Sequence, residues 1–167
     1  MARRSGTLPK TAHDHHDRIL RHVDRLPILA EMLGRGEPSR FGRAFERECR
    51  FVTGQLVPHM AAIETTLYER LEAVMGGRHS MAPMREEHEQ LRHLIGSLCA
   101  YRAQSLAGGL AADDEIGLRR VLFRLYSMLR VHLAEEELYL GVLDHALGDE
   151  EKAALARGID HAAAEPL

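Results

Sequence analysis

Residues 114–147 have the sequence DEIGLRRVLFRLYSMLRVHLAEEELYLGVLDHAL, which contains no proline and no pair of glycines. Apolar side chains recur in it every three or four residues, the period of an amphipathic helix, and Asp113 and Asp114 are good N-cap residues at its start. The predicted inward face carries Val121, Leu125, Met128, His132, Glu136, Tyr139 and Leu143. A histidine and a carboxylate therefore lie in the middle of a helix face that is otherwise largely apolar.

Glycine and proline divide the rest of the chain into three further helical segments, each with its own apolar stripe. These segments are residues 12–33, 41–75 and 80–107. Four amphipathic helices with short connections predict an all-α fold, an antiparallel four-helix bundle that runs up-down-up-down. The bundle domain is predicted over residues 12–147, with an N-terminal tail at 1–11 and a short C-terminal helical tail at 148–167.

The first segment fits the helical pattern in two registers. One register turns inward His16, Ile19, Val23, Leu26 and Ala30. The other turns inward His15, Ile19, His22, Leu26 and Leu29. Both registers bring at least one histidine to the interior, and the pattern alone leaves the choice between them open.

Composition and charge exclude several classes of protein. A chain of 167 residues is long enough for one domain with a proper core. The formal net charge of −3 gives no reason to expect binding to nucleic acid or to an anionic membrane. No apolar run has the length of a signal peptide or a membrane span, and Cys49 and Cys99 lie in helical patterns that fit reduced thiols. We therefore expect a cytoplasmic protein.

The chain contains 11 histidines, several times the usual number, and one lies on each of the four stripes. His16, His59, His88 and His132 lie 18, 18, 19 and 18 residues from the segment boundaries at one end of the predicted bundle. At about 1.5 Å per residue they share one layer, roughly 27 Å from that end. A single histidine on an apolar face is as often as not a hydrogen-bonded core residue, but four in one layer indicate a metal site.

Carboxylates follow two of these histidines on helices that run in the same direction. Glu64 follows His59, and Glu136 lies four residues after His132 on the same face. Both carboxylates are expected in the next layer, where they can bridge two metal ions. An ionised carboxylate in a bundle core costs roughly several kcal/mol unless a cation compensates it. Imidazole and carboxylate without thiolate suit iron or manganese, with zinc as an alternative.

Two further residues are metal-site candidates of lower rank. His22 lies about six residues above the histidine layer. The second register of the first helix turns it inward, where it can either bind a metal ion or donate a hydrogen bond to one of the metal ligands. Glu137 directly follows Glu136 and is expected chiefly at a solvated edge. Tyr68 and Tyr139 follow the two acidic motifs and are expected to be core aromatics with a polar tip.

Four pieces of the sequence together resemble the hemerythrin-like, or HHE cation-binding, domain family. They are HHDRIL at 15–20, PHMAAIETTLY at 58–68, REEHEQLR at 85–92 and HLAEEELY at 132–139. The resemblance spans nearly the whole chain and implies a non-heme di-iron centre, bridged by an oxo group or a carboxylate, that reacts with dioxygen, nitric oxide or peroxide or senses iron. It implies as metal ligands His16, His59, His88 and His132, with Glu136 as a bridging carboxylate.

Two positions depart from the family's pattern. The family has a glutamate four residues after the second-helix histidine, where this chain has Ile63, so Glu64 has to reach the site from the next position round the helix. The oxygen carriers have a second histidine four residues after the first on the third helix, where this chain has Arg92 after His88. The first departure predicts a weakened subsite unless Glu64 is a ligand. The second argues against reversible oxygen carriage and favours sensing, peroxide turnover or iron handling.

Two other functions compete with a di-iron centre. One is a metal-poor or metal-free helical bundle that acts as an interaction or regulatory module, in which Ile63 marks the decay of the site. The other is a heme-binding bundle, for which the neighbouring carboxylates are unfavourable. The sequence leaves open the identity and number of the metal ions, the physiological small molecule, the choice between sensing and turnover, and the oligomeric state.

Overall fold

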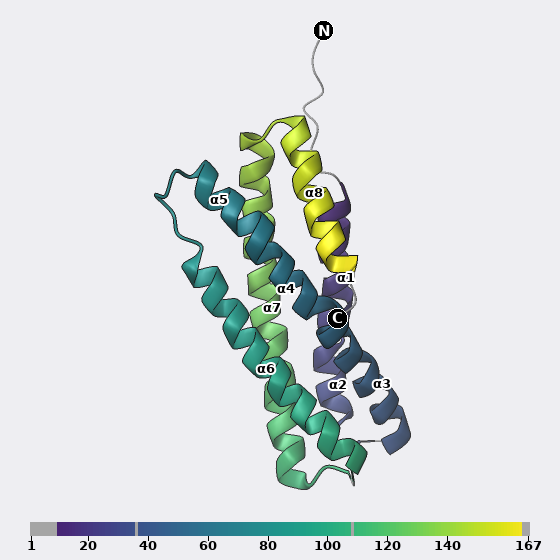
Figure 1. Cartoon of the computed structure of the whole chain (residues 1–167). Coiled ribbons are helices and arrows are strands. Elements are labelled where there is room, and N and C mark those ends of the chain that lie inside the picture. Colours follow the sequence, from purple (N-terminus) through teal and green to yellow (C-terminus); the bar gives the residue numbers. More distant parts are fainter. Residues whose placement is uncertain (1–9, 36, 108, 165–167) are drawn as a thin grey trace.

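The structure is a computed structural model that describes residues 10–35, 37–107 and 109–164, and these ranges contain helices and turns but no strand (Figure 1). The predicted all-α bundle is confirmed. Its first rod is α1 (Lys10–Val23) and α2 (Leu26–Met32), and its second rod runs from α3 (Pro38–Phe51) to α5 (Glu69–Val74). The third and fourth rods are α6 (Ala82–Ala107) and α7 (Ala112–Ala146), and α8 (Asp149–Ala164) follows. In Figure 1 the chain descends α1 and α2, ascends from α3 to α5, descends α6 and ascends α7.

The first rod is bent between α1 and α2. Pro27 has no N–H to donate to the carbonyl of Val23, so α1 ends at Val23 and α2 begins at Leu26 with the proline in its first turn. Gly34 follows α2 with a φ of 69°, a left-handed conformation that glycine adopts without steric cost. The rod buries every member of the first predicted register, whereas His22 of the second register is only half-buried.

The second rod is one continuous helix that contains two π-helical turns, η1 (Val52–Leu56) and η2 (Glu64–Tyr68), on either side of α4 (Val57–Ile63). Each π turn accommodates an extra residue and rotates the side chains that follow it. Pro58 cannot donate to the carbonyl of Gly54, which explains why the regular α-helical bonding is interrupted near η1. The rod does not break there, and the chain continues along the bundle from α3 to α5 (Figure 1).

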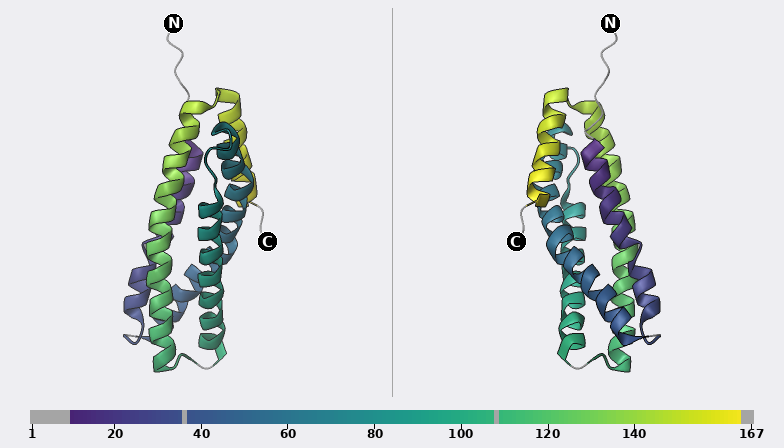
Figure 2. Two further views of the ribbon diagram at one scale, coloured as in Figure 1. Left: turned by 90° about the vertical axis from the view of Figure 1, so that its left-hand side faces the viewer. Right: turned by 90° about the vertical axis from the view of Figure 1, so that its right-hand side faces the viewer.

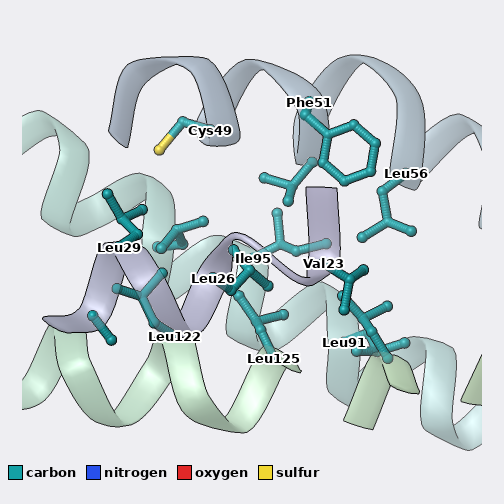
Figure 3. Close-up of a cluster of buried hydrophobic side chains, with 14 of the residues drawn as sticks. Val23, Leu26, Leu29, Cys49, Phe51, Leu56, Leu91, Ile95, Leu122 and Leu125 are labelled. Atoms are coloured by element: carbon teal, nitrogen blue, oxygen red, sulfur yellow. The ribbon is translucent and has the colours of Figure 1, made fainter. Parts of the chain in front are cut away.

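The buried apolar side chains form two clusters rather than one. The first core cluster includes Val23, Leu26, Leu56, Leu91 and Leu125 (Figure 3), and it also includes Leu133. The second core cluster includes Ile63, Leu67, Tyr68, Leu71, Met84, Leu140, Leu155 and Ile159. On α6, His88 lies between Met84 and Leu91, and on α7, Glu136 lies between Leu133 and Leu140. The buried histidines therefore form a polar layer between two apolar clusters.

The C-terminal segment is a helix of 16 residues, α8, which packs against α4 and η2. Figure 2 shows α8 along one end of the bundle. There it buries Leu155, Ala156 and Ile159. Lys152 is also buried, with its Nζ 3.2 Å from Asp144 Oδ1 on α7. None of the described helices is long and apolar enough to cross a membrane.

The two cysteines differ in environment, which gives a first prediction. Cys49 is 1% exposed, and burial raises the pKa of its thiol to about 12, whereas Cys99 is half-buried. Because the thiolate is the reactive form, we expect iodoacetamide at about pH 8 to modify Cys99 first and to leave Cys49 unmodified until the protein is denatured. Peptide mass mapping of both sites against time measures this. Equal labelling rates in the folded protein would contradict the buried position of Cys49.

Candidate metal centre

Four imidazoles and one carboxylate meet in the polar layer. They come from four different rods: His16 from α1, His59 from α4, His88 from α6, and His132 with Glu136 from α7, where the two lie one turn apart. Each of the five residues is at most 4% exposed. The structure therefore brings together the four histidines that the spacing of the sequence places in one layer.

Glu136 lies between two pairs of histidines. Its Oε2 is 3.3 Å from His16 Nε2 and 3.4 Å from His59 Nε2. Its Oε1 is 3.5 Å from His88 Nε2 and 3.2 Å from His132 Nε2. The two triads share this carboxylate, and within each triad the candidate ligand atoms lie within 4.8 Å of one another. We call them the His16 subsite (His16, His59, Glu136) and the His132 subsite (His88, His132, Glu136).

Three of the four imidazoles contact a second carboxylate with their outer nitrogen. The Nδ1–carboxylate distances are 3.0 Å for His16 and Glu137, 2.7 Å for His88 and Glu64, and 2.8 Å for His132 and Glu87. In each pair the carboxylate comes from a different rod than the histidine. An ionised carboxylate only accepts, so Nδ1 carries the proton and Nε2 faces inward. These contacts orient the rings and also tie the rods together.

Either a proton or a metal ion is needed where the inner nitrogens meet. With Nδ1 protonated, a neutral imidazole directs its Nε2 lone pair at Glu136, and His88 Nε2 lies only 2.8 Å from His132 Nε2. Lone pairs at these distances repel one another unless a proton or a metal ion lies between them. The donor set, four imidazole nitrogens and two oxygens of one buried carboxylate, is one that a metal ion would satisfy.

The charges of the polar layer favour a proton on two of the imidazoles that surround Glu136. Burial by itself raises the pKa of Glu136, but hydrogen bonds with the imidazoles, led by His132, hold that pKa well below its usual range. Burial opposes protonation of His16 and His132, yet Glu136 and the outer carboxylates raise the pKa of both. Burial lowers the pKa of His59. A metal ion that binds here therefore displaces protons from imidazole.

The three remaining sequence candidates lie outside the two subsites. Glu64 accepts from His88 Nδ1 and, at 2.7 Å, from Arg92 Nη2, so its carboxylate lies behind the ligand layer. Burial opposes ionisation of Glu64, but hydrogen bonds from Arg92 and His88 lower its pKa. Glu137 likewise contacts the outer nitrogen of His16.

His22, the third of these candidates, is separate from the layer. Its Nδ1 lies 2.7 Å from Glu48 Oε2, and its ring stacks on Phe51 with the centroids 4.0 Å apart. Glu48 is 1% exposed and also accepts from Arg47 Nε at 2.9 Å. His22 and Glu48 thus form a polar pair of their own beside the first core cluster.

Tyr68 adds a hydroxyl group to the His132 subsite. The residue is fully buried, and its hydroxyl donates to Glu136 Oε1 at 2.8 Å and lies 3.3 Å from His88 Nε2. Burial, followed by the charge of Glu136, raises the pKa of Tyr68, so the hydroxyl stays protonated. Ile63, at the position where the family pattern has a glutamate, is buried in the second core cluster. In place of that carboxylate, the phenol is the further oxygen next to Glu136.

Two residues that contact the polar layer were not among the metal-site candidates predicted from the sequence. Glu87 lies in a charged run that suggests a solvated face, and only the packing of α6 on α7 shows that it contacts His132. His15 was turned inward by the second register alone, but it is 8% exposed and its ring centroid lies 4.8 Å from that of His59. Burial and then the neighbouring His59 lower the pKa of His15 to about 3. His15 Nε2 and His59 Nδ1 are each buried without a hydrogen-bond partner among the described residues.

Comparison with known proteins gives one match. Residues 7–162 match the sequence model of the family described as the hemerythrin HHE cation binding domain. The match covers all four rods and most of α8, and includes every residue of the two subsites. No curated protein and no solved structure matches the chain.

Proposed function

Since the chain belongs to the hemerythrin HHE cation-binding domain family, we propose that its polar layer holds two non-heme iron ions and that this centre binds a small oxidant in order to sense or reduce it. The oxidant is dioxygen, peroxide or nitric oxide. Family membership and the buried His/Glu cluster support metal binding as such. The observation that carries the proposal is the shared carboxylate, in which each oxygen of Glu136 faces a different pair of imidazoles.

The donor set favours iron over the alternatives, manganese and zinc. Each subsite offers two histidines and one carboxylate, the combination that non-heme iron centres use while keeping positions open for dioxygen or a related ligand. Zinc has no redox chemistry, whereas an iron pair supplies the electrons that a small oxidant accepts. The low number of protein ligands supports a centre that reacts with an exogenous molecule rather than one that is only structural.

The protein's own residues hold protons and exclude water at this centre. Tyr68 keeps a proton at its hydroxyl oxygen, 2.8 Å from Glu136 Oε1 and beside the His132 subsite. An oxidant bound there would have a hydrogen-bond donor within reach as its oxygen atoms gain charge. The two core clusters lie on either side of the polar layer, so few water molecules compete for the proton. Glu64, Glu87 and Glu137 keep the imidazoles oriented while this happens.

The test is the metal content of the purified chain together with its visible spectrum, before and after anaerobic loading with ferrous iron. We expect two iron ions per chain, and we expect His16→Ala and His132→Ala each to lose at least one ion because each removes a donor from one subsite. His93→Ala is the matched control, because its side chain is 79% exposed on α6. Mixing the reduced, loaded protein with peroxide, dioxygen or nitric oxide then identifies the oxidant by its spectral change.

Two outcomes would reject the proposal. If the loaded chain keeps less than a tenth of an equivalent of iron, the metal-free interaction module becomes the better interpretation, and the buried Ile63 would mark the loss of the site. Full iron content in both His16→Ala and His132→Ala would show that the ions bind elsewhere.

A second prediction concerns the outer carboxylates. Glu87→Gln removes the anionic acceptor behind His132, which loosens the orientation of that imidazole and lowers its basicity. Loss of such a partner typically weakens metal affinity about 10–100-fold, and competition with a ferrous chelating dye measures this loss. Glu86→Gln is the matched control, since Glu86 is the exposed neighbour on the same helix. Equal affinities of the two variants would mean that the Glu87 contact does not support the site.

A further inference from the structure

The outer face of α7 exposes a row of large apolar side chains. Ile116, Phe123, Val131, Leu138 and Val142 are 46%, 43%, 58%, 72% and 42% exposed. They make up five of the seven large exposed apolar residues of the described chain. Scattered apolar residues are ordinary on a protein surface, but a continuous row along one helix indicates an interaction surface.

The five residues share one side of the helix. Successive spacings of 7, 8, 7 and 4 residues place them within an arc of about 100° on a helix with 3.6 residues per turn. The opposite side of α7 faces the bundle, where Leu118, Leu122, Leu125, Leu129 and Leu133 are at most 3% exposed. α7 therefore has two apolar faces, and the bundle covers one of them. In the left-hand view of Figure 2, α7 runs the height of the bundle on one side.

The charges beside the row are separated along the helix. The exposed arginines Arg120 and Arg124 flank its N-terminal half, whereas Arg130, at the middle of the row, pairs with Asp24 of the same chain at 3.4 Å. Glu135 flanks its C-terminal half, whereas Glu137 and Asp144 are engaged within the chain by His16 and Lys152. A surface that is basic at one end and acidic at the other is complementary to itself when two copies meet head to tail, and repels itself when they meet in parallel.

The N-terminal half of the row also borders a shallow hollow of about 500 Å³. It is lined by Ile116, Arg119, Arg120, Phe123, Arg124 and Ser127. The C-terminal half of the row carries the projecting side chains Leu138 and Val142 instead. One half of the face therefore offers a depression and the other half the apolar side chains to fill it.

We propose that this face binds the same face of a second copy of the chain, with the two α7 helices antiparallel about a two-fold axis between residues 130 and 131. The axis places Phe123 opposite Leu138 of the partner subunit, because both lie 7.5 residues from it. Ser127 then meets Ala134 of the partner subunit, and these small residues let the helices approach closely. Leu138 and Val142 of the partner subunit enter the hollow. A self-complementary patch with a two-fold axis is the usual basis of a homodimer.

The size of the face indicates a dimer that dissociates on dilution. The row from Ile116 to Val142 is about 40 Å long, and one helix is about 10–12 Å wide. Contact along α7 therefore buries roughly 900 Å² in total, below the range of about 1,200–2,000 Å² that stable complexes bury. We expect the monomer to dominate at low micromolar concentration and the dimer near millimolar concentration, with no dependence on metal content.

Cysteine cross-linking tests the register of the pairing. In a Cys99→Ser background, a short bismaleimide should cross-link Val131→Cys with itself, since this residue lies next to the axis. Neither Phe123→Cys nor Leu138→Cys should cross-link with itself, but a mixture of the two variants should cross-link. Ala103→Cys, on an exposed part of α6, gives the level of random collision. Cross-linking of Phe123→Cys with itself and of Leu138→Cys with itself would show a parallel pairing and would overturn the proposal. Cross-linking yields no higher than that of Ala103→Cys for every variant would also overturn it.

Light scattering across a concentration series tests the surface without any cross-linker. Ala134→Arg places two like charges near the axis and should keep the chain monomeric at the highest concentration, whereas Ala103→Arg should dimerise like the parent. Both alanines are exposed, so neither change should alter the melting temperature. A parent chain that stays monomeric throughout, or an Ala134→Arg chain that still dimerises, would overturn the proposal. Because α7 pairs through the side away from Glu136, failure here leaves the di-iron proposal intact, and metal analysis decides that question separately.

Discussion

The variant Glu136→Gln is expected to lose both metal ions, while a histidine variant disables one subsite directly. Glu136 belongs to both triads, and an amide retains only one oxygen and no negative charge. The fold should survive, because the amide NH₂ can donate to the imidazole nitrogens that face it. We therefore expect the iron content after anaerobic loading to fall from two ions per chain to a trace, with an unchanged circular dichroism spectrum.

The neighbouring acids on α7 are the controls for this experiment. Glu135→Gln alters a half-buried residue outside both triads and should keep two ions. Glu137→Gln removes the acceptor at the outer nitrogen of His16, so it should weaken binding without abolishing it. A Glu136→Gln protein that retains two ions would show that this carboxylate is not the bridge between them.

Removal of the metal is expected to lower the melting temperature strongly. A ligand that binds only the folded chain stabilises it by about 4 kcal/mol at a thousandfold excess over its Kd. For a chain of this size that corresponds to roughly 8–16 °C in Tm. Once the metal ion is removed, only protons on the neighbouring imidazoles compensate the charge of the fully buried Glu136 carboxylate. Thermal unfolding with and without a strong chelator measures the difference.

The same experiment on Glu136→Gln separates loss of metal from other effects of the chelator. That variant should melt at one temperature with or without chelator, close to the value for the metal-free parent. A parent whose Tm does not move on chelation would favour the metal-free module. A variant whose Tm falls with chelator would mean that metal still binds to it.

The all-α bundle and the histidine layer were predictable because both depend on local signals. Glycine and proline end the helices, and the distance of each histidine from those ends sets its height in the bundle. Errors of a residue or two at a helix end shift that height by only about 1.5–3 Å. The grouping of His16, His59, His88 and His132 around Glu136 therefore tolerates the uncertainty of the boundaries.

The role of Glu64 was not predictable, because it depends on the shape of the second rod. From His59 onward, Ile63, Leu67 and Leu71 are buried at intervals of four residues. On a regular α-helix, side chains four residues apart differ in direction by about 40° around the helix axis. The wider π turn η2 compensates for this difference. Side chains in and after η2 are thereby rotated. Glu64 contacts the outer nitrogen of His88, and Tyr68 contacts Glu136.

Contacts between segments that are distant in the sequence cannot be predicted from the periodicity of its apolar residues. Glu87 reaches His132 only because α6 packs on α7. The burial of His15 beside His59 depends on the packing between rods, and the sequence offered two registers for it. The bend after α1, by contrast, has a local cause in Pro27. Local rules therefore identified the inner donors, whereas the outer partners needed the tertiary structure.

The division of the interior into two clusters has a consequence for how a metal ion reaches its site. A hydrated ion cannot pass through a layer whose five donors are at most 4% exposed and whose two sides are packed with aliphatic side chains. Few apolar contacts cross the polar layer, so the end of the bundle that holds α5, the start of α6 and α8 forms a local unit that can unfold while the first core cluster remains intact. Hydrogen exchange should then be faster in that end, and the rate of iron uptake should follow its opening.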